Sequence, residues 1–327
     1  MMNNSPLQQP VIEECRSGRL PFPCPIAALL LCAAGLFPDL RALDRDPTES
    51  QAPAIQVSGS MDREQRRTEP ATSVFAQAEV VSTSVSPTFK TGSTHTNTIG
   101  LVLIYIPAGS FEMGSPMEDA DLFTSSTRSR DEDLHFVDLP QPFLLGRTEV
   151  TQGQWRAVMG NSPSKFTGSD DLPVEQVSWN DAMAFCAKLT AIEHSSGALP
   201  AGWLYTLPTE EQWEYACRAG MPASYSGELD PLAWYAENSG MKTQPVATKA
   251  PNAWGLYDML GNVWEWTRTH HLDLEKYATS QNIPFRVDRG GAYGSGAQFC
   301  RPAYRSGRDQ SARDPGIGFR LAAVPSP

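Results

Sequence analysis

The sequence predicts an α+β fold with a few short helices, many irregular connections and a long amino-terminal segment outside the core. Only three stretches carry clear helix-start signals, and the chain after Gly220 is rich in Gly, Trp and Asn. All eight tryptophans lie between Trp155 and Trp266, so the aromatic core belongs to the second two-thirds of the 327 residues. A chain of this length accommodates one large domain with a tail, or two domains, at roughly 100–200 residues per domain.

Charge and periodicity exclude several classes of protein. The formal net charge is −11, which disfavours a phosphate-binding surface and predicts that nucleic acid is not a partner. The sequence shows no heptad pattern and no fixed repeat of roughly 20–50 residues, which excludes fibrous and solenoid architectures.

Residues 1–37 are predicted to form an export segment. Arg16 and Arg19 precede an uncharged apolar run of twelve residues, Ile26 to Phe37. A helix of that length spans about 18 Å, less than the roughly 30 Å of a bilayer core. A short apolar run behind positive charge is typical of a secretory signal. We therefore expect a periplasmic or secreted protein with no stable membrane span after processing.

Residues 38–99 are predicted to be a linker. Ser, Thr, Pro and charged residues dominate this stretch, and aromatic residues are nearly absent. Such a composition cannot bury enough apolar area to offset an ordering cost of roughly 1–2 kcal/mol per residue. Order is expected to begin sharply at Leu101, so the folded domain is placed at residues 100–325.

The first part of the domain is predicted to alternate strands and loops. The run LVLIYIP from Leu101 is β-rich, a turn at Ala108-Gly109-Ser110 follows, and FEMGS continues the chain. The acidic stretch 118–133 is expected to be a surface loop. The run HFVDLPQPFLLGRTEVT, from His135, is expected to be a broken strand.

Three helices are predicted from their caps. Thr151 is expected to cap a short helix, and Ser178 a second one that contains AMAFCAKLTAI. Thr209 and Gln212 form a capping box for a third helix, WEYACRAG, which Gly220 is expected to end. Beyond that point the pattern indicates loops with short strands.

Seven stretches of the domain together carry a family resemblance. They are IPAGSFEMGS, RTEVTQGQW, PVEQVSWNDAMAFC, YTLPTEEQWEYACRAG, PNAWGLYDMLGNVWEW, RGGAY and IGFRLA, and they span about Leu101 to Ala323. In order and spacing they resemble the formylglycine-generating enzyme, or sulfatase-modifying factor, family. The resemblance implies a C-type-lectin-like fold with little regular secondary structure. Members include copper-dependent oxidases, maturation factors and ligand-binding proteins, so the fold alone does not assign a function.

The resemblance implies one structural calcium site. Family members bind calcium at the segment that matches residues 258–266. The matching ligands here are the side chains of Asp258 and Glu265 and the carbonyl oxygens of Gly261 and Val263. Hard oxygen donors around a glycine-containing turn suit Ca²⁺, which takes six to eight oxygen ligands. From the chemistry of the residues alone, the alternative is an acidic turn whose carboxylates cap backbone amides.

The resemblance also points to copper chemistry that the sequence contradicts. In the oxidases, two cysteines five residues apart bind Cu(I) as thiolates, the ligands that this soft ion prefers. Aligned on Arg289-Gly290-Gly291, the second cysteine is Cys300, but the first position holds Ser295. Because a hydroxyl cannot replace the thiolate, we expect no copper-dependent oxidation, and Cys300 and Ser295 are the candidate remnants of a catalytic site.

The pairing of the three cysteines in the domain stays open. Cys186 and Cys217 match positions that exported oxidases of the family use for disulfides, but the partner positions hold other residues. A disulfide between Cys217 and Cys300, with Cys186 as a buried thiol, is one arrangement, and one sequence does not fix the connectivity.

The segment from Tyr293 to Arg313 is predicted to bind a ligand. Its small, polar and aromatic residues suit an exposed, adaptable surface on a fixed scaffold, and Tyr and Arg are favoured binding anchors. The candidate ligand-binding residues are Tyr293, Ser295, Gln298, Phe299, Tyr304, Arg305 and Arg308. The alternative is that the four arginines of the segment only pair with acidic residues of the same domain, as exposed ion pairs worth about 0–1 kcal/mol each.

These expectations describe an exported, calcium-braced member of the family that lacks copper-oxidase activity. It would bind a protein or small-molecule ligand, or serve as an accessory or maturation protein. Two alternatives stay open. One is an oxidoreductase of the formylglycine-generating or a related maturation type with an altered active site. The other is a C-type-lectin variable protein diversified by a retroelement, which the resemblance of the segment 293–313 to such proteins suggests.

Overall fold

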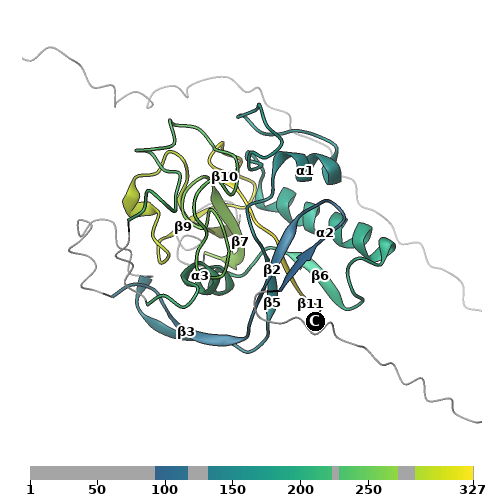
Figure 1. Ribbon diagram of the computed structural model, residues 1–327, viewed down its shortest axis with the longest axis horizontal. Coiled ribbons are helices and arrows are strands. Elements are labelled where there is room, and N and C mark those ends of the chain that lie inside the picture. The colour runs from purple at the N-terminus through teal and green to yellow at the C-terminus, as the bar shows by residue number, and fades with distance from the viewer. Residues whose placement is uncertain (1–92, 117–131, 223–227, 272–283, 327) are drawn as a thin grey trace, which may run out of the picture. The chain divides into compact units, whose positions relative to one another are not determined.

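The computed structural model describes residues 93–116, 132–222, 228–271 and 284–326, all within the unit formed by residues 78–327. The predicted export segment, most of the predicted linker and most of the acidic loop lie outside these ranges. Within them, short strands and three α-helices alternate with long irregular connections (Figure 1). The architecture is α+β, as the sequence predicts.

A five-stranded antiparallel sheet joins the beginning and the end of the domain. Its strands, in spatial order, are β1 (Thr94–Thr96), β2 (Val102–Ile106), β5 (Phe143–Gly146), β11 (Ala322–Pro325) and β6 (Trp203–Thr206). The last strand of the domain therefore lies in the interior of the sheet, between β5 and β6 (Figure 1).

This sheet is apolar on both faces, because successive residues along a strand enter different cores. Leu103 and Leu144 pack in a cluster with helices α1 (Gln152–Met159) and α2 (Trp179–Ser196). Ile104 and Leu145 pack in a second cluster with helix α3 (Glu210–Arg218). The continuous apolar runs in the sequence are thus typical of strands covered on both sides.

All three helices begin at the predicted caps. Thr151, Ser178 and Thr209 each accept a hydrogen bond from the backbone N–H three residues on, and a reciprocal bond completes each capping box. These bonds satisfy donors that a helix start leaves unpaired. The third helix ends at Arg218, because Ala219, rather than Gly220, is the first residue with left-handed φ, at 47°.

A second sheet lies beside α3, and its strands come from residues 264–318. Its strand order is β10 (Ile317–Gly318), β7 (Trp264–His270), β8 (Phe285–Arg289) and β9 (Arg305–Asp309), with β10 parallel to β7 and the other pairs antiparallel. A separate two-stranded ribbon, β3 (Gly109–Met113) and β4 (His135–Leu139), also contacts α3. The predicted ligand segment therefore runs from the loop after β8 through the edge strand β9.

The predicted linker reaches too far into the domain. Residues 94–96 form β1, which pairs with β2. The side chain of Glu193, buried in α2, accepts hydrogen bonds from the backbone N–H and the hydroxyl of Thr98. Backbone pairing and one buried carboxylate thus order a stretch whose low hydrophobicity gave no sign of structure.

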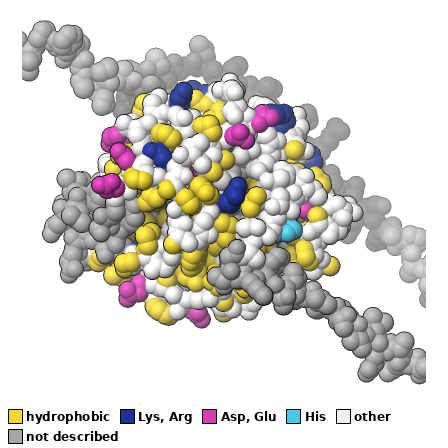
Figure 2. All heavy atoms as spheres, in the orientation of Figure 1, with side chains coloured by type: hydrophobic (Ala, Val, Ile, Leu, Met, Phe, Trp, Pro, Cys, Tyr) yellow, Lys and Arg dark blue, Asp and Glu magenta, His cyan; other side chains and the backbone are white. Residues whose placement is uncertain are grey.

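The visible part of the surface in Figure 2 carries no large patch of one charge. Basic and acidic side chains are scattered over it in small groups, between hydrophobic and neutral ones. Among the helices of the described ranges, none is both long and apolar enough to span a bilayer.

Candidate functional site

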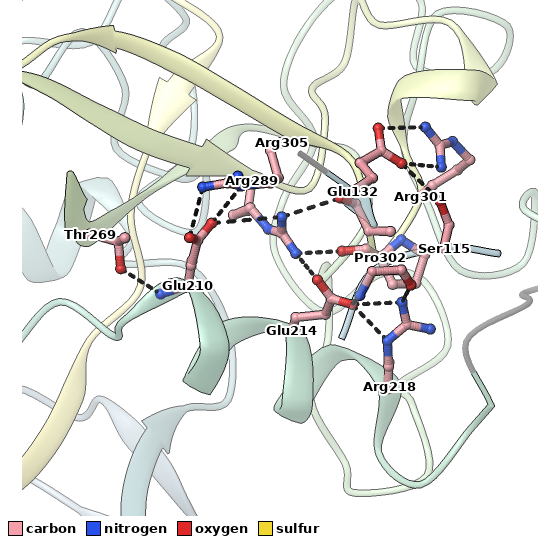
Figure 3. Close-up of polar contacts among 12 residues, drawn as sticks. Ser115, Glu132, Glu210, Glu214, Arg218, Thr269, Arg289, Arg301, Pro302 and Arg305 are labelled. Atoms are coloured by element: carbon pink, nitrogen blue, oxygen red, sulfur yellow. Dashed lines mark hydrogen bonds and ion pairs between the residues drawn. The ribbon is translucent and has the colours of Figure 1, made fainter. Parts of the chain in front are cut away.

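A buried network of ion pairs fixes the predicted ligand segment to helix α3 (Figure 3). Glu214 binds Arg289, at the end of β8, and Arg218, one turn further along its own helix. Glu210 accepts two hydrogen bonds of 2.8 Å from Arg305, at the start of β9. The side chains of Glu214 and Arg289 are at most 1% exposed. Because these charges are withdrawn from water, removal of one partner would leave the other uncompensated.

The remaining arginines of the segment are paired as well. The pairs are Arg301–Glu132, Arg308–Asp288 and Arg313–Asp181. Only Arg313 is mainly exposed, at 55%, whereas the carboxylates of Glu132 and Asp288 are fully buried. The structure therefore shows that the four arginines pair with acids of their own domain, and most of these pairs are partly buried rather than exposed. Arg305 and Arg308 were predicted to contact a ligand, but their guanidinium groups form ion pairs with Glu210 and Asp288.

The aromatic residues of the segment are half-buried and pack on the core. Phe299 and Tyr304 form an edge-to-face pair with ring centroids 5.1 Å apart, and Tyr304 also contacts Trp264. Tyr293 packs edge-on against Phe166, again at 5.1 Å. Each ring thus presents only part of its surface to solvent, and its truncation would remove core contacts together with any ligand contact.

Ser295 and Gln298 lie in the loop between β8 and β9, both half-buried. The Ser295 hydroxyl accepts a hydrogen bond of 3.0 Å from the Ala292 N–H, so it stabilises the turn. Met241, which is not among the residues predicted from the sequence, is 60% exposed and lies beside Gly294. It adds apolar surface next to the segment, and its position 50 or more residues earlier in the chain gave no sequence signal.

The residues present do not fit a two-thiolate copper site. Cys300 is 1% exposed and belongs to the second core cluster. A side-chain carbon at Gly291 would lie 2.6 Å from its sulfur, which shows how tightly the thiol is enclosed. Burial, with a smaller contribution from the charge of Glu237, raises the pKa of this thiol to about 12. The first ligand position holds the Ser295 hydroxyl, a weakly acidic oxygen in place of a soft sulfur.

Three of the predicted calcium residues, Asp258, Gly261 and Val263, lie in one buried loop before β7, and the fourth, Glu265, is the second residue of that strand. Asp258 and Asn262 adopt left-handed φ values of 54° and 57°, which fold the loop back on itself. Asp258 Oδ2 accepts a hydrogen bond of 2.7 Å from the Ala247 N–H, while its buried Oδ1 has no hydrogen-bond partner among the described residues. Glu265 accepts two hydrogen bonds of 2.6 Å from Arg320. Burial raises the pKa of Asp258 to about 6.

A third buried carboxylate, Glu149, joins this loop and was not selected from the sequence. It accepts hydrogen bonds from the side-chain amide of Asn262 at 2.9 Å and from the Val263 N–H at 3.3 Å. Burial raises its pKa well above the ordinary value, and the two neighbouring carboxylates raise it further, against the effect of Arg320. The carboxylates of Glu149, Asp258 and Glu265 thus lie near a single guanidinium, that of Arg320. A divalent cation would reduce this excess of negative charge.

The loop fits a calcium ion in part. The described residues contain no group of three or more His, Cys, Asp or Glu side chains arranged to hold a metal. The ligand set implied by the resemblance needs only two side chains beside two carbonyl oxygens, and Glu265 already binds Arg320. The unpartnered Oδ1 of Asp258, next to the excess negative charge, is the feature that fits a hard cation.

The three cysteines of the domain are free and buried thiols. The disulfide between Cys217 and Cys300, one of the arrangements left open by the sequence, is not formed. Burial raises the pKa of Cys217 to about 12 and that of Cys186 further still, so none of the three resembles an activated nucleophile.

Residues 92–324 match the family described as sulfatase-modifying factor enzyme 1-like domain. A Paenibacillus barcinonensis protein named chaperone protein LppX is 30% identical over 245 residues, with 61% of this chain and 84% of that protein covered. The formylglycine-generating enzyme of Bos taurus is 34% identical over 201 residues, with 53% of this chain and 50% of the bovine protein covered. A second bovine protein, named inactive C-alpha-formylglycine-generating enzyme 2, is 31% identical over 202 residues, with coverage of 55% and 59%. The chain thus spans about half the length of these two bovine relatives.

Solved structures confirm the fold. Treponema denticola variable protein 1 superposes with a TM-score of 0.57 at 31% identity, covering 71% of this chain and 99% of that one. PvdO from Pseudomonas aeruginosa superposes with a TM-score of 0.59 at 26% identity, covering 72% and 99%. The fold is therefore the C-type-lectin-like fold that the sequence resemblance implied.

Proposed function

The chain belongs to the family of sulfatase-modifying factor enzyme 1-like domains, and from this premise we propose that it is a ligand-binding or accessory protein without copper-dependent formylglycine oxidase activity. The observation that carries the proposal is the pair Ser295 and Cys300. Where the oxidases of the family have two thiolates, this chain has one hydroxyl engaged with a backbone N–H and one thiol enclosed in the core.

The relatives are compatible with both an active and an inactive member. One carries the name of a chaperone, one that of an inactive enzyme and one that of a formylglycine-generating enzyme. Family membership therefore does not decide between oxidation and binding. The support for binding is Ser295, because Cu(I) prefers soft sulfur ligands over a hydroxyl.

We place the ligand contact on the segment 293–313. Tyr293, Phe299 and Tyr304 each expose part of a ring there, and the network around α3 holds the base of the segment in place. A surface fixed in this way loses little conformational freedom on binding. The similarity to a solved structure named variable protein 1 supports the narrower proposal that this segment is the variable region of a diversified binding protein.

A gain-of-function variant tests the copper argument. Ser295→Cys supplies a second sulfur five residues before Cys300, and Ser311→Cys, on an exposed residue, adds a thiol elsewhere as the matched control. We expect Ser295→Cys to bind Cu(I) in excess of the wild type and the control, measured by competition with a chelator. The wild type, incubated with copper, oxygen, a reductant and a sulfatase-type peptide, should yield no aldehyde. Aldehyde formation by the wild type would overturn the proposal.

We also propose that the protein is exported. The support is the apolar run behind Arg16 and Arg19. Mass spectrometry of the protein recovered from fractionated cells should find a chain shortened near residue 37 outside the cytoplasm. A chain that starts at Met1 and stays in the cytoplasm would contradict export without affecting the binding proposal.

A further inference from the structure

A recess of about 350 Å³ lies apart from the segment 293–313. It is open to solvent and is bordered by the turn after β5, the start of α1 and the turn 245–248, and its lining includes Val102, Arg147, Thr148, Gln154, Asp171 and Ala247. Its size lies within the range of roughly 300–1,000 Å³ that is typical of small-molecule sites. None of its lining residues belongs to the segment 293–313, so an inference about it is independent of the ligand surface proposed above.

Two side chains of opposite charge face this recess without ion-pair partners. The guanidinium of Arg147 lies 5.8 Å from the centroid of the Tyr257 ring, and no carboxylate among the described residues pairs with it. The carboxylate of Asp171 likewise has no hydrogen-bond or ion-pair partner in the part of the chain that the structure describes. Both are exposed, and they do not pair with each other. This contrasts with the arginines of the segment 293–313, which are all paired.

The backbone around the two charges is fixed. The Arg147 N–H donates to the Val102 carbonyl at 2.8 Å, and the Arg147 carbonyl accepts from the Tyr257 N–H at 2.9 Å. The Asp171 carbonyl accepts from the Val246 N–H at 3.0 Å. The wall of the recess is therefore formed before any ligand binds, which reduces the ordering cost of binding.

Neutral groups complete the lining. Gln154 uses its side-chain oxygen for the Thr151 N–H, which leaves its two amide hydrogens as donors. Thr148 donates its hydroxyl hydrogen to the Glu149 carbonyl, so its oxygen can still accept. The side chains of Val102 and Val246 are half-buried and offer apolar contact.

We propose that this recess binds a zwitterionic small molecule of about dipeptide size. The ligand carboxylate would bind the planar fork of Arg147, a geometry that favours two parallel hydrogen bonds, and the ligand ammonium would bind Asp171. A ligand with one charge only would satisfy one of these groups and bring its own charge near a like one. A zwitterion satisfies both.

Three related probes and the full chain test this. Alanyl-alanine carries both charges, N-acetyl-alanyl-alanine lacks the ammonium, and alanyl-alanine amide lacks the carboxylate. We expect alanyl-alanine to bind most tightly in calorimetry. Arg147→Gln should weaken the binding of alanyl-alanine about tenfold or more. Asp171→Asn should weaken the binding of alanyl-alanine but not that of N-acetyl-alanyl-alanine. Arg147→Lys, which keeps the charge but loses the fork, should give an intermediate affinity.

Arg156 and Asp170 provide matched controls. They form an exposed ion pair next to the recess but do not line it. Arg156→Gln and Asp170→Asn should leave the affinity unchanged, and melting temperatures should confirm that all variants fold. The proposal is overturned if alanyl-alanine does not bind at about 10 mM. It is equally overturned if the three probes bind alike, if Arg147→Gln acts no more strongly than Arg156→Gln, or if Asp171→Asn has no effect.

Discussion

Glu265 and Arg320 lie 55 positions apart in the sequence and form a two-point ion pair, with both N–H···O distances at 2.6 Å. Arg320 is fully buried and also donates to the carbonyl oxygens of Gly146 and Tyr257. One guanidinium therefore connects the end of β5, the loop that carries the candidate calcium residues and the start of β7.

Arg320→Met should destabilise the protein by about 3–5 kcal/mol, because it leaves the buried Glu265 carboxylate without its counter-charge. Urea unfolding followed by tryptophan fluorescence measures this. Arg156→Met is the matched control, because its pair with Asp170 is exposed, at 46% and 69%, and should cost about 0–1 kcal/mol. Equal losses in the two variants would show that the buried pair has no special role in stability.

Calcium should raise the free energy of unfolding of the wild type. A ligand that binds only the folded state adds about 2.7 kcal/mol at a hundredfold excess over its Kd. Asp258→Ala removes the unpartnered oxygen and should abolish the gain, whereas Asp170→Ala, on an exposed residue, should retain it. Melting curves with calcium and with a chelator distinguish these cases. An unchanged melting temperature of the wild type would exclude the site.

Without calcium, stability should fall as the pH rises from about 4 to about 6. Burial raises the pKa of Asp258 from 3.8 to about 6, so in this window the folded protein holds a proton that the unfolded chain releases. The loss of stability from ionising the buried Asp258 is absent below the ordinary pKa of the group and complete above its raised pKa. Asp258→Asn removes the titration and should flatten this part of the profile. Identical chelator-treated profiles for the two proteins would contradict the assignment to Asp258.

Phe299 should contribute to stability, whereas Gln298 and the neighbouring Met241 should contribute little. Phe299→Ala should destabilise by about 1–3 kcal/mol, because Phe299 is half-buried against Tyr304. Gln298→Ala and Met241→Ala should change stability by no more than about 0.5 kcal/mol. The latter two are therefore the variants with which to test binding to a partner obtained by pull-down. A large loss of stability in both would mean that this surface is structural.

Local signals in the sequence predicted the local parts of the fold. Thr151, Ser178 and Thr209 act through residues three positions away, so their capping roles are visible in a short stretch of sequence. The exception was β1, which depends on pairing with β2 and on Glu193, 95 positions from Thr98. Strand formation in a polar stretch depends on such distant partners, and composition does not contain them.

The candidate site was less predictable for the same reason. Glu149 lies 113 positions from Asn262 and Glu214 lies 75 positions from Arg289, so neither contact has a sequence pattern. The arginine-rich segment was expected to be an exposed surface, because its composition is polar. In the fold most of its charges meet buried carboxylates, which a count of charged residues cannot reveal.

The interior position of β11, between β5 and β6, bears on how the sheet forms during synthesis. A nascent chain presents β5 and β6 long before β11 leaves the ribosome, and until then these two strands lack their shared neighbour. Unpaired strand edges favour association with other chains. Premature termination upstream of Ala322 would therefore give a product with an open sheet, which proteases and chaperones can recognise. The five-stranded sheet can therefore be completed only after β11 has been translated.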